Sequence, residues 1–353
     1  MSMSPRERVM AAVSRRKPDR VPKTADFTPA VMEVFRQRTG GNDPSEYFGM
    51  EPRFVGLNPT QKQADFSAYL GELPPGAGVR EHGVADVPGS LHHFTRMIHP
   101  LRNMCRAHEL PDYPWPDLQA DYRYAGLVDK VKAFHDAQYL VVGFVGHIFE
   151  TSWYMRGMEQ LLVDFSDNPE FASALLDRIT TDNCFITRRM AEAGVEMVLL
   201  GDDVGMQNRM IMKPQSWRRW LKPRLARVIA AGRQVNPRLH ILYHSDGNIL
   251  PIIPDLIEVG VTVLNPVQPE SMDPAMVKKQ FGEFLAFWGT IGTQTTMPFG
   301  TPDEIERTVK VRIETVGKGG GLLLAPTHVL EPDVPWENIL ALFSAIEKHG
   351  RMA

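Results

Sequence analysis

The feature that most constrains this chain is a repeated alternation of short apolar segments with longer amphipathic ones. The apolar segments are nearly continuous in Val, Ile and Leu, which is typical of parallel strands buried on both faces. Repeated strand–helix units of this kind form either an open doubly wound sheet or a closed (β/α)₈ TIM barrel. This chain has no G-x-G-x-x-G after its first predicted strand, which a dinucleotide-binding sheet would carry, and the count of eight strands favours the closed barrel. We expect strands at residues 20–26, 53–57, 139–145, 197–201, 239–243, 261–264, 284–288 and 321–325.

The length of the chain agrees with a single barrel. Its 353 residues exceed an ordinary domain, but one α/β barrel of about 250 residues or more is common. We therefore expect one catalytic barrel domain over residues 1–353. Residues 50–125 are rich in Pro, Gly and His and show no clear period, so we interpret them as a long irregular insertion over one face of the barrel.

Composition excludes several classes of protein. The formal net charge of −3, from 39 basic and 42 acidic residues, gives no reason to expect a nucleic-acid partner. Cys105 and Cys184 are far apart and form no C-x-x-C pattern, so neither a disulfide framework nor a thiolate metal site is predicted. No apolar run approaches the roughly 20 residues of a membrane helix, and the first residues lack a signal-peptide core. We expect a cytoplasmic protein.

Polar side chains of chemical interest recur just after the predicted strands. Because the carboxyl ends of barrel strands share one face, where active sites are normally built, we expect these side chains to lie together. For Asp203 and Asn248, each taken alone, a cap or turn role is the favoured interpretation. The polar residues in these positions are Glu150, Asp202, Asp203, His244, Asp246, Asn265, Gln268, Gln294 and His328.

His244 and Asp246 are two residues apart at a strand end, so in extended backbone both side chains point the same way. His328 follows the last strand. Together these groups make a plausible facial set for a divalent metal, with Glu150 as a fourth ligand. The same atoms could form a metal-free acid–base cluster in which Asp246 orients His244, and the sequence leaves both interpretations open.

Other polar residues are less specific. Arg209 and Arg156 could hold a substrate carboxylate through bidentate pairing, although a solvated salt bridge explains either one equally well. His147, which follows Gly146, is better explained by a structural or exposed position than by catalysis.

Five stretches of the chain resemble a known superfamily. They cover the start and nearly all of the second half, in the order found there, and the superfamily is that of uroporphyrinogen decarboxylase. The stretches are SPRERVMAAVSRRKPDRVP, GDDVGMQNRMIMKPQSWRRWLKPRL, LYHSDGNILPIIPDLIEVGVTVLNPVQP, GTIGTQTTMPFGTPDEIERTV and GGGLLLAPTHVLEPDVPWENI. The resemblance implies a distorted (β/α)₈ barrel with a deep cleft at the C-terminal face, and residues 50–125 have no match in it.

The resemblance implies two chemistries. True decarboxylases of this superfamily remove acetate carboxyls from a tetrapyrrole without a cofactor, and an arginine-rich loop after the first strand holds the substrate carboxylates. The corresponding stretch here is ADFTPAVMEVFRQRTGG, which has no such cluster and places Asp26 and Thr28 where positive charge would be needed. A substrate with many carboxylates would be poorly matched.

The second branch transfers methyl groups between a corrinoid protein and a thiol or folate. Its thiol-directed members bind zinc through His-x-Cys after the fifth strand and a Cys in an APGC-like turn after the eighth. This chain has His244-Ser245-Asp246 and an APTH turn ending in His328 at those places. Two histidines and one carboxylate leave a more Lewis-acidic centre than thiolates do, which suits polarising an ether or hydroxyl oxygen, or binding a water.

The leading hypothesis is therefore a methyltransferase of this superfamily, acting on a small methylated substrate with a corrinoid protein, thiol or folate. Zinc would be bound by His244, Asp246 and His328, with Glu150 as fourth ligand or acid. The residues predicted to contact the substrate are Asp26, Asp202, Arg209, Asn265, Gln268 and Gln294.

Two alternatives stay open. One is a cofactor-free decarboxylase of a tetrapyrrole or smaller acid, in which Asp26 or Asp202 stabilises a protonated intermediate. The other is a non-catalytic module that binds a corrinoid or tetrapyrrole, because a fold does not fix a function. The oligomeric state is also open, with a homodimer as one candidate.

Overall fold

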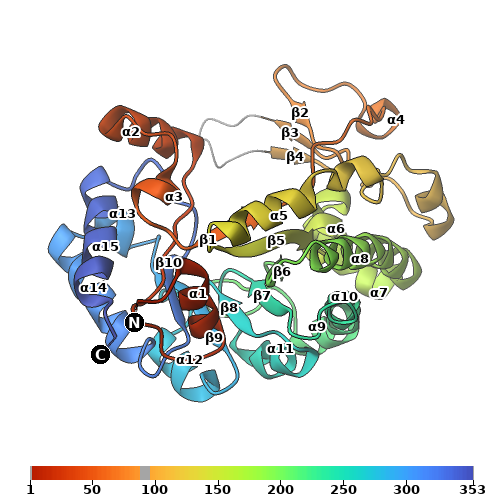
Figure 1. The fold of residues 1–353 in the computed structure, drawn as a ribbon. Coiled ribbons are helices and arrows are strands. Elements are labelled where there is room, and N and C mark those ends of the chain that lie inside the picture. Colours follow the sequence, from red (N-terminus) through yellow and green to blue (C-terminus); the bar gives the residue numbers. More distant parts are fainter. Residues whose placement is uncertain (1, 88–95, 353) are drawn as a thin grey trace.

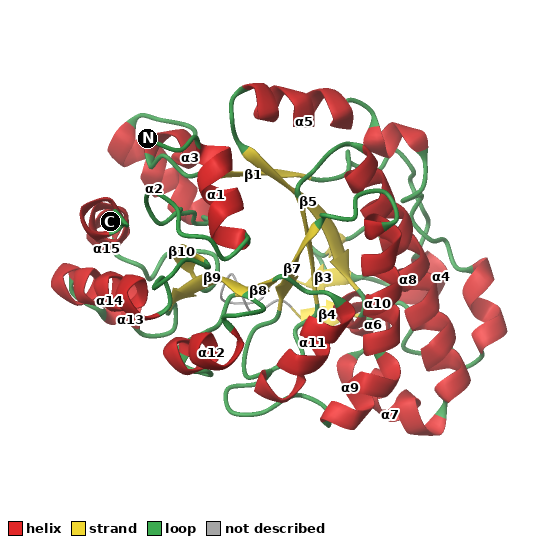
Figure 2. Cartoon of the chain, turned by 60° about the horizontal axis from the view of Figure 1, so that its bottom comes forward, coloured by secondary structure: helices red, strands yellow, loops and turns green. Residues whose placement is uncertain are grey.

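The computed structural model describes residues 2–87 and 96–352. Its centre is a curled sheet of parallel strands, around which the helices are arranged (Figures 1 and 2). The sheet has seven strands, in the order β1-β5-β6-β7-β8-β9-β10. Their bounds are β1 Pro52–Val55, β5 Leu140–His147, β6 Met197–Gly201, β7 His240–His244, β8 Val263–Asn265, β9 Ala286–Ile291 and β10 Leu322–Pro326.

Within residues 2–87 and 96–352, the prediction of eight regular strands is corrected to seven, and these strands do not close a barrel. The predicted first strand, residues 20–26, makes an isolated parallel bridge between Lys23 and Leu324 of β10. On its other side, the Lys23 backbone N–H donates to the Glu51 side chain at 2.9 Å rather than to a strand. Pro22 has no N–H to offer a ladder, so this segment cannot pair regularly along its length. The fold is a TIM-barrel-like curled sheet.

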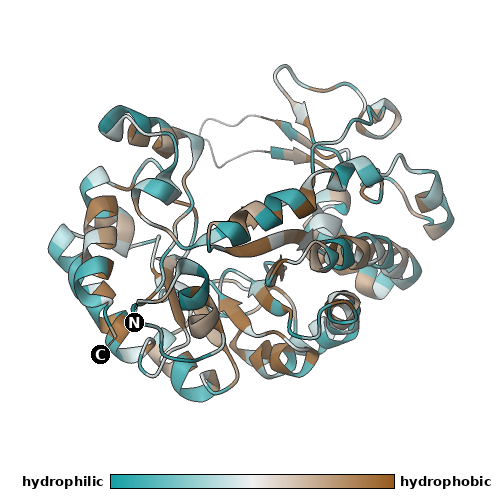
Figure 3. Ribbon diagram, in the orientation of Figure 1, coloured by the Kyte–Doolittle hydropathy of each residue, from teal (hydrophilic) through white to brown (hydrophobic). Residues whose placement is uncertain are grey.

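One end of the sheet is filled by α1 (Pro5–Val13), whose N-terminus carries a capping box between Ser4 and Glu7. Val9 and Val13 of this helix join a buried cluster with inward-facing strand residues such as Leu140 and Leu323. Because strand side chains alternate between faces, a second and larger core lies between the sheet and the outer helices. In Figure 3 the strands are accordingly mostly hydrophobic, and the outer helices are amphipathic, with hydrophobic and hydrophilic residues along each helix. The opposite, C-terminal end of the sheet is left for a site.

The outer helices begin at residues that favour a helix start. α14 has Thr301 as its N-cap, in a capping box with Glu304, and Pro302 lies in its first turn. α9 and α10 are separate helices, because Pro223 has no N–H to continue a helix and lies in the first turn of α10. The helices are α2 Pro29–Thr39, α3 Pro44–Tyr47, α5 Leu127–Asp136, α6 Phe149–Arg156, α7 Met158–Asp167, α8 Pro169–Glu192, α9 Pro214–Trp220, α10 Lys222–Arg233, α11 Ile253–Val259, α12 Pro274–Phe281, α13 Thr296–Phe299, α14 Pro302–Thr315 and α15 Trp336–His349.

The segment predicted as an irregular insertion, residues 50–125, contains more regular structure than expected. Besides β1 it forms a three-stranded antiparallel sheet, and residues 88–95 within it lie outside the described residues. The guanidinium of Arg80 lies 5.1 Å from the ring of Tyr154, which places this small sheet beside α6. Its elements are α4 Ser67–Leu70, β2 Gly78–Val79, β3 Ala85–Val87, β4 Arg96–Ile98, and the 3₁₀ helices η1 Ala107–Asp112 and η2 Asp121–Tyr124.

Among the residues that the structure describes, none of the helices combines the length and the apolar character that crossing a bilayer requires.

Candidate functional site

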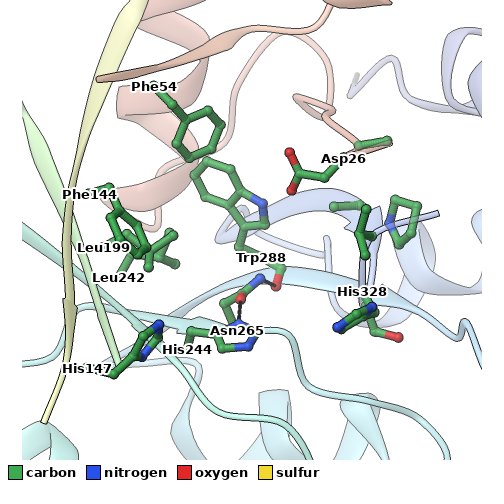
Figure 4. A pocket seen from close by; sticks show the side chains of 15 residues that line it. Asp26, Phe54, Phe144, His147, Leu199, Leu242, His244, Asn265, Trp288 and His328 are labelled. Atoms are coloured by element: carbon green, nitrogen blue, oxygen red, sulfur yellow. Dashed lines mark hydrogen bonds between the residues drawn. The ribbon is translucent and has the colours of Figure 1, made fainter. Parts of the chain in front are cut away.

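A cavity of about 260 Å³ opens at the C-terminal ends of the strands (Figure 4). One part of its wall is apolar, and there the Phe54 and Trp288 rings meet edge to face with centroids 6.1 Å apart. The remaining wall carries polar side chains from several strand ends. The apolar lining includes Phe54, Phe144, Leu199, Leu242 and Trp288, and the polar lining includes Asp26, His147, His244, Asn265 and His328.

Strand register brings the polar residues into one row. His147 of β5 is paired with Gly201 of β6, Gly201 with His244 of β7, and His244 with Asn265 of β8. Gly201 leaves room for this row, because a Cβ at that position would lie 2.3 Å from the His244 carbonyl oxygen. The site is therefore built on regular strands rather than on loops alone.

The tautomer of His244 follows from its neighbours. The Asn265 side-chain nitrogen donates to the Trp288 carbonyl at 2.9 Å, so the Asn265 oxygen is the atom left for His244. That oxygen lies 2.5 Å from His244 Nδ1, which must then be the N–H donor. Nε2 is directed instead at two carboxylates, 3.6 Å from Asp203 and 3.9 Å from Asp246.

Asp203, His244 and Asp246 form a group that could hold a metal ion, since one ligand atom from each lies within 4.8 Å of the others. The Asp246 backbone N–H donates to Asp203 Oδ1 at 2.8 Å and fixes the two loops together. Asp246 Oδ1 is buried and has no hydrogen-bond partner among the described residues, which is costly for a carboxylate oxygen unless a cation binds there. One imidazole nitrogen with two carboxylates is a ligand set that suits a divalent metal such as zinc.

The electrostatics of this cluster favour binding of a positive charge. Burial lowers the pKa of His244, but the carboxylates of Asp246 and Asp203 outweigh it and hold that pKa above its ordinary value. Burial raises the pKa of Asp246, and the nearby His244 offsets this only in part. A bound cation would relieve the repulsion between the two carboxylates and take the place of the proton on His244 Nε2.

Glu150 and His147 lie beside the cluster rather than in it. The Tyr154 hydroxyl donates to Glu150 Oε1, while Glu150 Oε2 lies 3.7 Å from His147 Nδ1. The His147 ring meets the His244 ring edge to face, with centroids 6.4 Å apart. Burial raises the pKa of Tyr154, so its hydroxyl remains a donor at physiological pH. His147 therefore lies between Glu150 and His244, in ring contact with His244 and without a hydrogen bond to Glu150 among the described residues.

Asp26 and His328 occupy the other wall of the cavity, and Figure 4 shows them across from His147. His328 is exposed at the mouth and lies outside the group of potential ligands that the described residues form. Desolvation inside the cavity raises the pKa of Asp26, although His328 and His244 both act to lower it. The proposed metal ligand His328 is therefore placed where it can contact a substrate.

The other residues predicted to bind substrate do not line this cavity. Asp202 is buried, and its carboxylate accepts the Glu150 backbone N–H at 2.9 Å, so it anchors the start of α6. Gln268 is also buried and accepts the Gly247 N–H at 2.6 Å, which fixes the loop after β7. Arg209 and Gln294 are exposed on the surface. Arg156 forms a buried pair with Asp164 at 2.6 Å.

Sequence reasoning missed two residues of the site. Asp203 was interpreted as a cap. It lies two positions after Gly201, the partner of His244 in the sheet, and residues two apart in an extended backbone point to the same face. His147 was assigned a structural role, but a register shift in β5 between Phe144 and Gly146 brings it into line with His244. For Asp203, the two consecutive acids in Gly-Asp-Asp were a signal that the sequence offered. For His147, the sequence offered no comparable signal.

Comparison with known proteins decides the family. The family profile described as Uroporphyrinogen decarboxylase (URO-D) matches residues 96–349. The chain belongs to the uroporphyrinogen decarboxylase family. The matched span contains β5 to β10 and the whole Asp203–His244–Asp246 group. No curated protein sequence matches this member of the family.

Solved structures relate this uroporphyrinogen decarboxylase family member to a methyltransferase from Methanosarcina mazei. The two share 19% sequence identity with a TM-score of 0.68, over 98% of this chain and 99% of that one. At this identity the similarity establishes a common fold. A GH27 β-L-arabinopyranosidase from Geobacillus stearothermophilus follows at a TM-score of 0.42 and 12% identity, over 96% of this chain and 78% of that one. Xylanase 10B from Thermotoga maritima has a TM-score of 0.39 and 10% identity, over 65% and 81%. Neither of these two bears on function.

Proposed function

We propose that this protein is a metal-assisted methyltransferase. It would move a methyl group between a small methylated molecule and a corrinoid held by a partner protein, with a thiol or folate as the other acceptors. The observation that carries this proposal is the group of Asp203, His244 and Asp246 at the ends of β6 and β7. The fold shared with the methyltransferase from Methanosarcina mazei supports it.

The proposed metal is zinc, and the ligands would be His244 Nε2 with the carboxylates of Asp203 and Asp246. Asn265 would hold the imidazole so that Nε2 faces the ion, because metal-bound histidines commonly donate their other ring N–H to a nearby oxygen acceptor. When bound, the ion would supply a Lewis acid that polarises the oxygen, nitrogen or sulfur atom bearing the methyl group.

The remaining cavity residues have roles that follow from their chemistry. Phe54, Trp288 and Leu242 would bind the apolar body of the substrate and keep water from the reacting atoms. Glu150, held by the Tyr154 hydroxyl, would exchange a proton with the departing or attacking heteroatom through His147. Asp26 would meet a polar group at the far side of the substrate.

The alternative of a tetrapyrrole decarboxylase has less support. No Arg or Lys occurs among the described residues that line the cavity. A substrate with many carboxylates needs such cations, because guanidinium and ammonium groups are the partners that hold carboxylates in proteins. The lining instead offers a carboxylate of its own, Asp26.

The experiment is a methylation assay with zinc-loaded protein and free reduced corrinoid, using methanol, 2-methoxyphenol, dimethyl sulfide and trimethylamine as donors. Methylation is followed by the change in the corrinoid absorption spectrum. We expect one donor class to react, and His244→Gln or a chelator to abolish turnover, while the surface variant Gln294→Ala retains it. Turnover that survives in His244→Gln, or decarboxylation of uroporphyrinogen by the wild type, would contradict the proposal. Corrinoid binding without turnover would favour the non-catalytic module.

A further inference from the structure

A second cavity, of about 400 Å³, adjoins the first. It lies between the end of β5, the middle of α8 and the insertion, and Phe144 and His147 line both cavities. The register shift in β5 between Phe144 and Gly146 occurs at this point. The second cavity therefore lies outside the sheet wall, next to the metal-ligand cluster but separate from it.

Two buried side chains in this cavity have unused hydrogen-bond donors. In the part of the chain that the structure describes, neither Nδ2 of Asn183 in α8 nor Nε of Arg123 has a hydrogen-bond partner, and the two residues are 5% and 4% exposed. A Cβ on Gly146 would lie 3.7 Å from the Asn183 side-chain oxygen, so the Asn183 amide faces the irregular part of β5. Burying a donor without a partner is unfavourable, so a ligand that offers acceptor atoms would recover the lost hydrogen bonds.

The charges around the cavity select against ionic ligands. Arg123 pairs with Glu81 at 3.0 Å and lies 3.5 Å from Asp117. Asp182 pairs with Arg178 at 2.5 Å. These three carboxylates outnumber the two guanidinium groups, which disfavours an anion, while the N–H groups of Asn183 and Arg123 require an acceptor, which a cation does not supply. Asp182 Oδ2 also makes no hydrogen bond among the described residues and is held only by its ion pair with Arg178. An uncharged acceptor is the chemistry that remains.

Leu57, Leu118, Ile179 and Ile186 form an apolar part of the wall, and His82, His147 and Thr151 are further polar residues that line it. We infer that the second cavity is a binding site for an uncharged carboxamide, whose carbonyl oxygen accepts from Asn183 Nδ2 and Arg123 Nε while its apolar body packs against Ile179 and Ile186. This site needs no metal and no methyl transfer, so it stands or falls separately from the proposed function.

The test is a binding titration with three probes of similar shape, benzamide, benzoate and benzylamine, followed by saturation-transfer NMR on the full chain. Benzamide should bind more tightly than either ion. Asn183→Asp keeps the side-chain shape but replaces the donor with a carboxylate oxygen, and it should weaken benzamide at least about tenfold, the equivalent of roughly 1.4 kcal/mol. Thr181→Ala, on the exposed side of the same helix, should leave binding unchanged.

A second variant guards against misfolding of the first. Leu57→Trp adds bulk from the partly buried insertion side of the cavity and should block benzamide without altering the α8 packing. Tighter binding of benzoate or benzylamine than of benzamide would overturn the inference. Equal benzamide affinity in wild type, Asn183→Asp and Leu57→Trp would do the same, as would no benzamide binding at all.

Discussion

His244 donates its Nδ1–H to the side-chain oxygen of Asn265 over 2.5 Å, and this contact determines which imidazole nitrogen faces Asp203 and Asp246. Asn265 is itself fixed by its bond to the Trp288 carbonyl at 2.9 Å. The chain Trp288–Asn265–His244 is thus a positioning device made of three neighbouring strands. It directs Nε2 toward the two carboxylates, where a metal ion would take the place of the Nε2 proton.

Removing this acceptor should weaken metal binding without removing a ligand. We expect Asn265→Leu to lower zinc affinity about 10–100-fold, because the imidazole loses the partner that sets its tautomer and orientation. Zinc titration of chelator-stripped protein by calorimetry measures the effect. Gln294→Leu, an exposed amide on the same face, is the control and should bind like the wild type. An unchanged zinc affinity in Asn265→Leu would show that Asn265 does not position His244 for the metal.

Asp203 and His328 should differ as metal ligands. Asp203→Asn keeps an oxygen that can accept the Asp246 N–H at 2.8 Å but removes the charge that would bind the ion. We expect zinc affinity to fall by more than about tenfold in Asp203→Asn, and to change little in His328→Asn. The same calorimetric titration compares the two. If His328→Asn is the weaker binder, the ligand set expected from the family resemblance is the right one.

Gly201 should tolerate no side chain. An added Cβ would lie 2.3 Å from the His244 carbonyl oxygen, so Gly201→Ala must push β7 away from β6. We expect a loss of about 1–3 kcal/mol in the free energy of unfolding, the usual cost of overpacking, together with weaker zinc binding. Denaturant unfolding gives the first quantity. Gly78→Ala, whose Cβ would meet nothing within 4 Å, should match the wild type.

His240 should make the fold sensitive to acid at the opposite end of β7. Burial lowers the pKa of His240 to about 4, and Arg15 and Arg233 act in the same direction. An unfolded histidine has a pKa of about 6.5, so between these values the unfolded chain binds more protons. The His240 imidazole therefore has no effect on the free energy of unfolding above about pH 6.5. As the pH falls from there toward 4, proton uptake by the unfolded chain lowers the free energy of unfolding by on the order of 3 kcal/mol.

The measurement is the free energy of unfolding at pH 7.5 and at pH 4 for wild type and His240→Asn. The variant should lose less stability on acidification than the wild type, and the difference reports His240 alone. The exposed residue His108 supplies the control, because His108→Asn should follow the wild-type curve. Parallel curves for all three proteins would show that His240 is not held neutral in the folded state.

The strands could be predicted because their apolar runs are a local property of the sequence. The runs at 139–145, 197–201 and 239–243 coincide closely with β5, β6 and β7. The segment at 20–26 failed because pairing depends on backbone donors, and Pro22 and the Lys23–Glu51 contact remove them from the ladder. The spacing of hydrophobic residues does not indicate whether backbone N–H groups are available for strand pairing.

The site was predicted in place but not in detail. The i, i+2 spacing of His244 and Asp246 at a strand end was enough to locate it, and both belong to the potential ligand group. Asp203 joins them because two loops lie close together after β6 and β7, a contact between segments far apart in sequence. The apolar wall formed by Phe54 and Trp288 is likewise long-range and has no local signal.

Asp203, His244 and Asp246 should bind a metal ion. The metal content of untagged protein is the most direct test of this. Elemental analysis of the wild type should find a stoichiometric divalent metal, zinc by our proposal. Asp246→Asn, which discharges the carboxylate with the unpartnered buried oxygen, should purify with much less while keeping its fold. A folded wild type free of metal, which also binds none on titration with zinc, would contradict the account.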